Sequence, residues 1–179
     1  MTCLEDIETA VGWIENNSFE LPQTIRWGIL KKFSIFSDKA AEKVAEERIK
    51  DSSLQGYLQF LYCEAAYPNI ETKNKTWNLL TSQGSKIPKS QRLYMMKGFN
   101  QNSQKELLES FAFKYFYHLI SISVTTDLEF SLDFTKNLFP QHLSSIQYHV
   151  ENILNQISTT RGDIIIFLKQ KLEAIKLNQ

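Results

Sequence analysis

Hydrophobic residues recur every three or four positions along most of the chain, the spacing that brings side chains to one face of an α-helix. The stripe is clear near one end, from Leu4 to Ile14, and near the other, from Arg161 to Leu177. Segments of the same period lie between them, separated by short stretches that contain proline, glycine or small polar residues. The pattern predicts about nine or ten helices and no strand, and therefore an all-α fold.

Residues at the segment boundaries agree with this division. Pro22 and Pro88 suit the first turn of a helix, where a missing N–H costs nothing. Ser52 or Ser53 is a capping residue for one further helix and Asn69 for the next, and Gly84 suits the end of the second. Connections of about two to six residues indicate antiparallel neighbours. We therefore expect one all-helical domain over residues 1–179, built from stacked antiparallel helix pairs as a HEAT- or armadillo-like α-solenoid or superhelical array.

One segment carries an unusual number of aromatic rings. Ser103 and Glu106 have capping-box spacing, which predicts a helix from there to about Val124. Its residues form two apolar faces, the first consisting of Leu108, Phe111, Tyr115, Leu119 and Ile122, and the second of Phe113, Phe116, Tyr117, Ile120 and Val124. Because a helix that is apolar nearly all round is normally buried, we expect an inner element packed on both sides. The strip between the faces, where solvent or a ligand chamber would meet the helix, consists of Ser110, Lys114, His118 and Ser121.

Charge and composition narrow the classes of partner. The chain has 20 Lys and Arg residues and 20 Asp and Glu residues, so its formal charge is zero and nucleic-acid binding is disfavoured. No apolar run is long enough to span a bilayer, and the first residues do not resemble a secretory signal. Two cysteines cannot form a disulfide framework. These features predict a cytoplasmic protein that binds neither membrane nor nucleic acid.

Motifs for catalysis or metal binding are absent from the sequence. There is no HExxH, P-loop, GxSxG or GxGxxG pattern. His142 and His149 are two helical turns apart, too far for a pair of zinc ligands. Cys63 lies in an apolar helix, where cysteine is usually a small buried hydrophobe. We expect no catalytic residue, metal ligand or cofactor in this chain.

Two charged groups have structural interpretations. An acidic cluster on a lysine-rich helix consists of Glu46, Glu47 and Asp51. Such a cluster is typical of a solvated helix face with ion pairs at helical spacing. Arg26 precedes Trp27 in an apolar helix, so we expect it to be held by a carboxylate or by the end of a helix.

Four stretches, in order, carry a resemblance to a known family: "ELPQTIRWGILKKFSIF", "AEERIKDSSLQGYLQFLYCEAAYPNIETKNKTWNLL", "KGFNQNSQKELLESFAFKYFYHL" and "LFP". Together they resemble the C-terminal helical domain of zinc aminopeptidases of the aminopeptidase N family, particularly bacterial members similar to the endoplasmic-reticulum aminopeptidases. The signature positions are Arg26, Trp27, Asp51, Gly56, Pro68, Lys73, Trp77, Gly98, Phe99, Tyr115, Phe116, Phe139 and Pro140. Asn100 departs from the pattern, which has a larger residue there.

The resemblance implies a function for the chain. In this family the C-terminal domain is a bowl of stacked helices that covers the catalytic domain, closes the active-site chamber and limits which peptides enter. The zinc ligands and the general base lie upstream, so zinc is expected in the catalytic domain of a parent protein. The implied partners are that catalytic domain and, through it, peptide substrates. The alternative function is that of a free-standing α-solenoid that binds a protein or peptide. The sequence also leaves open whether the chain is a fragment of a longer protein or a separate gene product.

Overall fold

The computed structural model describes residues 4–15, 21–124, 127–157 and 161–177, and these ranges contain ten α-helices, two 3₁₀ turns and no strand. The all-α prediction is confirmed. The elements are α1 (Leu4–Glu15), α2 (Gln23–Phe36), α3 (Ala40–Lys50), α4 (Leu54–Ala66), α5 (Ile70–Gln83), η1 (Gly84–Lys86), α6 (Lys89–Phe99), η2 (Asn102–Gln104), α7 (Lys105–Ser123), α8 (Leu128–Asn137), α9 (Ile146–Leu154) and α10 (Gly162–Leu177). No described helix is long and apolar enough to cross a membrane.

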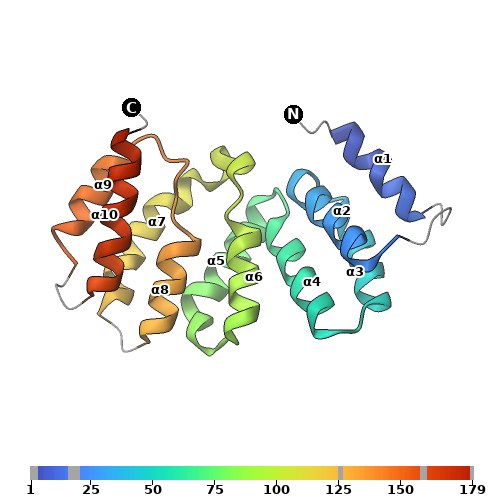
Figure 1. Ribbon diagram of the computed structural model, residues 1–179, viewed down its shortest axis with the longest axis horizontal. Coiled ribbons are helices and arrows are strands. Elements are labelled where there is room, and N and C mark those ends of the chain that lie inside the picture. The colour runs from blue at the N-terminus through green and yellow to red at the C-terminus, as the bar shows by residue number, and fades with distance from the viewer. Residues whose placement is uncertain (1–3, 16–20, 125–126, 158–160, 178–179) are drawn as a thin grey trace.

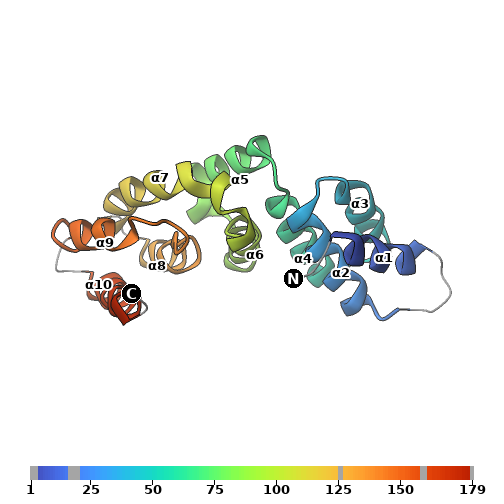
Figure 2. The same cartoon turned by 90° about the horizontal axis from the view of Figure 1, so that it is seen from above.

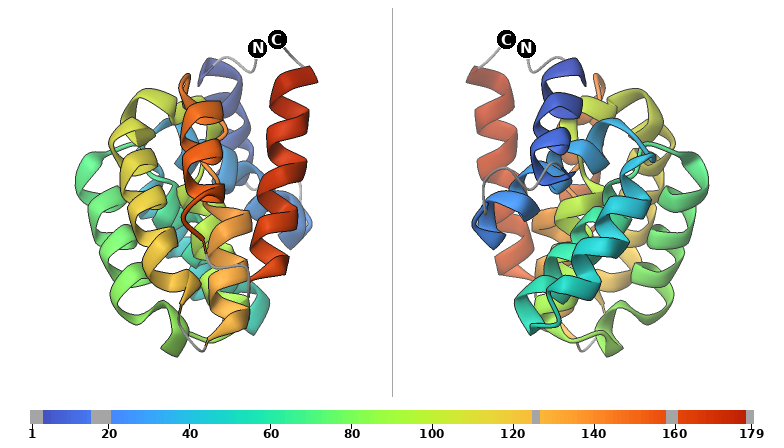
Figure 3. Two further views of the ribbon diagram at one scale, coloured as in Figure 1. Left: turned by 90° about the vertical axis from the view of Figure 1, so that its left-hand side faces the viewer. Right: turned by 90° about the vertical axis from the view of Figure 1, so that its right-hand side faces the viewer.

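The helices pack as successive pairs along a curve (Figures 1 and 2). Each even-numbered helix contacts the next, from α2 through α4, α6 and α8 to α10. Figure 2 shows α4, α6, α8 and α10 on the inner side of the curve, with α3, α5, α7 and α9 on the outer side. Viewed along the long axis, most helices run in roughly the same direction, across the curve (Figure 3). The predicted packing of helix pairs is confirmed, whereas assignment to a HEAT or armadillo class stays a prediction.

Local capping follows the sequence at three helices. The Ser53 side chain accepts a hydrogen bond from the backbone N–H of Gly56, and the Asn69 side chain accepts one from Thr72. The Asp127 carboxylate does the same for Phe130 at the start of α8. These bonds satisfy N–H groups that have no partner within the first helical turn.

The predicted capping box of Ser103 and Glu106 is wrong. The chain forms the 3₁₀ turn η2 at Asn102–Gln104, and α7 begins at Lys105 without a side-chain cap. The reason is that the Gln104 side chain is buried and donates to backbone carbonyls of two other helices. Tertiary hydrogen bonds therefore set the start of α7.

Buried hydrophobic residues form two clusters that meet at α4. Cys63 of α4 and Tyr67, the C-cap of α4, belong to the cluster formed with α1, α2 and α3. Ala65 of α4 belongs to the larger cluster formed with α5 to α10. A close approach between two helices lies at this junction, because a Cβ atom at Gly98 of α6 would lie 2.1 Å from the Tyr62 carbonyl oxygen of α4. Glycine at this position is therefore required by backbone packing rather than by local conformation.

Replacing Gly98→Ala should push α4 and α6 apart, because the clashing atom is backbone and cannot rotate away. We expect the free energy of unfolding, measured by urea titration, to fall by about 1–3 kcal/mol, as for other overpacked sites.

Gly28→Ala is the matched control, since a Cβ atom there meets nothing within 4 Å. Alanine in the middle of α2 should leave stability unchanged or raise it by about 0.5–1 kcal/mol. Equal stability of the Gly98→Ala variant and the wild type would contradict the packing described for α4 and α6.

Candidate functional site

Carbonyl groups at the C-terminal ends of α2, α4, α6 and α8 accept hydrogen bonds from side chains of other elements. The last four carbonyls of any helix have no partner within that helix. In this chain the donors are the side chains of Lys73, Asn100, Gln104 and Tyr115. Two of them, Lys73 and Tyr115, are signature positions, and Gln104 lies in the third motif.

Lys73 of α5 is fully buried and bridges two helix ends. Its Nζ donates to the carbonyl oxygens of Ala65 at 2.9 Å and Phe99 at 3.1 Å, and it lies 5.3 Å from the centre of the Phe99 ring. The negative ends of the α4 and α6 dipoles favour an ammonium group there. Burial acts in the opposite direction and lowers the pKa of Lys73 to about 7. No carboxylate among the described residues pairs with it.

Gln104 and Asn100 connect helices that are distant in sequence. The Gln104 side-chain amide donates to Ile35 of α2 at 2.6 Å and to Ala66 of α4 at 2.8 Å. The Asn100 amide donates to the carbonyl oxygens of Asn137 at 3.0 Å and Phe139 at 3.2 Å. Asn100, which departs from the pattern that the motif resembles, therefore ties the end of α6 to the end of α8.

Tyr115 ties α7 to α8. Its hydroxyl donates to the Thr135 carbonyl at 2.8 Å, and its ring stacks on Phe134 with centroids 5.5 Å apart. Complete burial raises the pKa of Tyr115 well above its ordinary value, so the hydroxyl stays protonated and donates at physiological pH.

A second polar contact joins α2 to the turn between α3 and α4. The Trp27 indole N–H donates to Asp51 Oδ2 at 2.7 Å, and the backbone N–H and hydroxyl of Ser53 donate to Oδ1 at 3.1 and 2.6 Å. Burial alone raises the pKa of Asp51, but these hydrogen bonds together hold it below its ordinary value. A Cβ atom at Gly56 would lie 2.2 Å from the Asp51 carboxyl carbon, which explains the spacing of Asp51 and Gly56 in the motif.

The acidic group on α3 differs from the sequence-based interpretation. Glu46 is exposed and pairs with Lys43 at 3.4 Å, but Glu47 and Asp51 are only 2% and 3% exposed. Glu47 pairs with Arg26 at 2.9 Å, and Arg26 also donates to the Leu21 carbonyl at 2.6 Å. The prediction that Arg26 is held by a carboxylate is confirmed, whereas the prediction of a fully solvated acidic face is wrong. A helical wheel of α3 alone does not reveal that α2 supplies the cation.

The remaining signature positions lie in the core or in turns. The Trp77 ring packs among Phe99, Phe111 and Phe134, with centroid distances of 5.6–5.9 Å. Phe116 and Phe139 are buried. Pro68 and Pro140 lie in the turns that follow α4 and α8. All of these contacts are between helices of the chain itself.

Sequence reasoning missed the buried Arg92 of α6. Its guanidinium donates to Asp133 at 2.8 Å and to Glu129 at 2.8 Å on α8, and also to the Ile87 carbonyl. Burial alone lowers the pKa of Arg92, but these bonds reverse the direction and raise it. The spacing of Arg92 in its own helix is unremarkable, so only the packing of α6 on α8 identifies it.

The polar strip predicted on the aromatic helix lies on α7, in the outer layer (Figure 2). Ser110, Lys114 and Ser121 are exposed, and Lys114 Nζ lies 4.5 Å from the centre of the Phe111 ring. His118 is partly buried and packs 6.5 Å from Trp77, centroid to centroid. Burial lowers the pKa of His118 despite an opposing backbone contact with Thr81. The strip does not converge into a catalytic arrangement, and its exposure to a chamber stays a prediction.

The second apolar face of α7 is only partly covered. Phe116 is buried against His149, whose ring stacks at 5.2 Å, but Phe113, Tyr117 and Val124 are 52%, 81% and 74% exposed. The prediction that α7 is packed on both sides is therefore wrong at these three positions. Hydrophobic periodicity shows which residues share a face but not whether a neighbour covers it.

No three His, Cys, Asp or Glu side chains come together as a metal site within the ranges that the structure describes. The described residues therefore provide no set of ligands that would fit a zinc ion. Cys63 is completely buried, and burial raises the pKa of its thiol to about 12, which makes it unreactive. The expected behaviour of Cys63 as a buried hydrophobe is confirmed.

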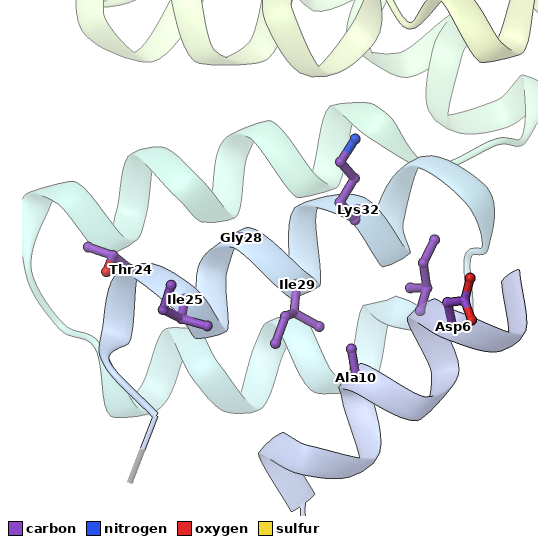
Figure 4. A pocket seen from close by; sticks show the side chains of 8 residues that line it. Asp6, Ala10, Thr24, Ile25, Gly28, Ile29 and Lys32 are labelled. Carbon is purple, nitrogen blue, oxygen red and sulfur yellow. The ribbon is translucent and has the colours of Figure 1, made fainter. Parts of the chain in front are cut away.

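An apolar groove lies between α1 and α2 (Figure 4). It has a volume of about 360 Å³, and Ala10, Ile25, Gly28 and Ile29 form its walls, with Asp6 and Lys32 toward one end. Ile25 is half exposed. The groove suits an apolar side chain or helix rather than a reaction that needs polar groups.

Comparison with known proteins gives a partial similarity. The chain is 22% identical over 116 residues to aminopeptidase N of Streptomyces lividans, and the match covers 65% of this chain. The chain spans about an eighth of that protein, 13% of its length. No protein-family profile matches the chain. The comparison thus relates the chain distantly to an aminopeptidase N.

Burial of Lys73 predicts a pH-dependent stability. The folded state has a pKa of about 7 for this group against 10.5 ordinarily, so the unfolded chain binds more protons between these values and stability rises with pH. Between about pH 7 and about pH 8.5 the free energy of unfolding should rise by about 1–2 kcal/mol. In the Lys73→Met variant this rise should disappear.

Lys75→Met, which alters an exposed lysine of the same helix, should keep the rise. The window lies above the pKa values of His118 and His142, which burial lowers. It also lies below the ordinary pKa of 9.0 of Cys63, whose burial makes stability fall as pH rises near and above that value. Urea unfolding of the three proteins at each pH provides the measurement. An identical pH profile for the wild type and Lys73→Met would show that Lys73 is charged in both states.

Proposed function

We propose that this chain is a non-catalytic C-terminal helical domain of a cytoplasmic zinc aminopeptidase of the aminopeptidase N type. In this role it caps the active-site chamber and limits which peptides reach it. The similarity over 116 residues to an aminopeptidase N is the observation that supports the proposal most directly. The contacts of Trp27, Lys73 and Tyr115 between helices add to this support, because these motif residues stabilise a stacked helical array.

The proposal gives the chain a structural role in catalysis. Hydrogen bonds at the helix ends fix how successive helix pairs pack and so maintain the curvature of the inner layer. A domain that covers a chamber needs such a curved surface. The zinc ion and its ligands belong to the catalytic domain of the parent protein, whose substrates are peptides with a free N-terminus. No catalytic step is assigned to a residue of this chain.

A free-standing binding scaffold is the second candidate. It is favoured by the apolar groove between α1 and α2 and by the exposed Phe113 and Tyr117 rings on α7. Exposed apolar surface of this kind is typical of a surface that meets a protein or peptide.

Two linked measurements test the first candidate. The reading frame upstream of residue 1 in the source genome should encode HExxH followed by a zinc-ligand glutamate. In that full-length enzyme, deletion of residues 1–179 should narrow the difference in hydrolysis rate between a short aminoacyl-anilide and a long folded polypeptide, because the chamber loses its cover.

The isolated chain should not hydrolyse an aminoacyl-anilide with or without added zinc. Robust zinc-dependent hydrolysis by the pure chain would contradict a non-catalytic role. A stop codon and promoter directly upstream would favour the scaffold, as would an unchanged substrate preference in the deletion variant.

A further inference from the structure

The apolar groove between α1 and α2 lies on the side of α2 that points away from α4 (Figure 4). On the α4 side, Trp27 and Leu30 are buried in one cluster with Cys63 of α4. The groove residues Ile25 and Gly28 lie about half a turn away around the same helix. Among the described residues, the inner layer therefore covers one side of α2 and leaves the other side without a neighbour from that layer.

The packing of α6 shows how helices of this layer stack. Gly98 of α6 lies against the backbone of α4, so close that a Cβ atom would be 2.1 Å from the Tyr62 carbonyl oxygen. Gly28 of α2 likewise faces away from the following inner-layer helix, but a Cβ atom there meets nothing within 4 Å. The space over Gly28 is therefore the position that a helix preceding α2 in the inner layer would take.

The lining of the groove matches a helix in length and polarity. Its α2 wall runs from Thr24 to Lys32, about 12 Å or two helical turns. Ala10 and Gly28 have the smallest side chains of the lining, which allows another backbone to approach closely. The charged groups of Asp6 and Lys32 lie toward one end (Figure 4), so the rest of the groove offers a continuous apolar surface.

The α10 end of the array has a different outer surface. Its exposed side chains include Asp163, Lys169, Gln170 and Glu173 alongside Ile166. A largely polar outer face is what a stacked array needs where its stacking stops. The α1–α2 end presents an apolar groove instead, as an array does where stacking continues.

We propose that the groove between α1 and α2 receives an amphipathic α-helix that precedes residue 1 in a longer parent polypeptide and extends the inner layer by one helix. Its apolar side chains, at three- and four-residue spacing, pack on Ile25 and Ile29, and a small residue lies over Gly28. A second copy of the chain is disfavoured, because two concave grooves offer each other no ridge and the outer face of α10 is largely polar. The inference rests on the proposed function only in requiring a longer parent.

Cysteine labelling in two contexts tests whether the groove is covered. Ile25→Cys and Ile166→Cys, each combined with Cys3→Ser, place a thiol at opposite ends of the array, where the wild-type residues are 50% and 59% exposed. In the isolated chain both thiols should react readily with a maleimide. In the full-length protein encoded by the source reading frame, Ile25→Cys should react at least about ten-fold more slowly, because its thiol is reached only when the helix detaches. Ile166→Cys should keep its rate, as mass spectrometry of the labelled peptides would show.

Crosslinking identifies what covers the groove. Benzoylphenylalanine in place of Lys32, at the rim, should crosslink on irradiation to residues three or four apart in one segment upstream of residue 1. Gly28→Leu should remove the protection of Ile25→Cys, because leucine fills the space that the helix needs. Gly12→Leu is the matched control, since a Cβ atom there also meets nothing within 4 Å and Gly12 does not line the groove. Circular dichroism of the isolated chain confirms that each variant folds.

Several outcomes would overturn the proposal. These are equal labelling of Ile25→Cys in both contexts, crosslinks without helical spacing, crosslinks between two copies of residues 1–179, and a stop codon directly upstream of residue 1. Protection of Ile25→Cys in a parent that lacks HExxH would support the groove assignment and reject the proposed function. An unprotected Ile25→Cys in a parent that contains HExxH would do the reverse.

Discussion

The carbonyls at the ends of the inner-layer helices need partners, and the rest of the structure depends on how that need is met. A stacked array brings these ends together at sites that are buried or partly buried. Each unsatisfied carbonyl would cost about 1–3 kcal/mol. Lys73 and Gln104 satisfy the ends of α2, α4 and α6, while Asn100 and Tyr115 satisfy the end of α8. Each donor comes from another element, so the hydrogen bonds also fix how one helix pair sits on the next.

The same array buries several charged groups, each with polar partners. Glu47 lies against Arg26, and Arg92 lies against Asp133. Arg161 holds Asp163 through two nitrogens and donates to Ser131 of α8 at 2.7 Å. Buried ion pairs contribute little net stability, but removing one partner is costly.

The open surfaces lie where the repetition of helix pairs is interrupted. The groove between α1 and α2 is at one end of the array, and a second cavity, lined in part by Phe139 and His142, is where a longer non-helical segment separates α8 from α9. In the middle of the array α4 and α6 pack closely, as the contact of Gly98 with the Tyr62 carbonyl shows.

The sequence by itself determined the helices, because hydrophobic period, proline and capping residues such as Asn69 act over only a few positions. It also marked Trp27, Lys73 and Gly98 through a family resemblance, without revealing what they touch. Only the tertiary structure decided that Glu47 and Asp51 are buried, that Gln104 replaces the expected capping box, and that Phe113 and Tyr117 are exposed. The physical reason is the same in each case: a helical wheel reports which residues share a face, whereas burial and hydrogen-bond partners depend on which other helix arrives there.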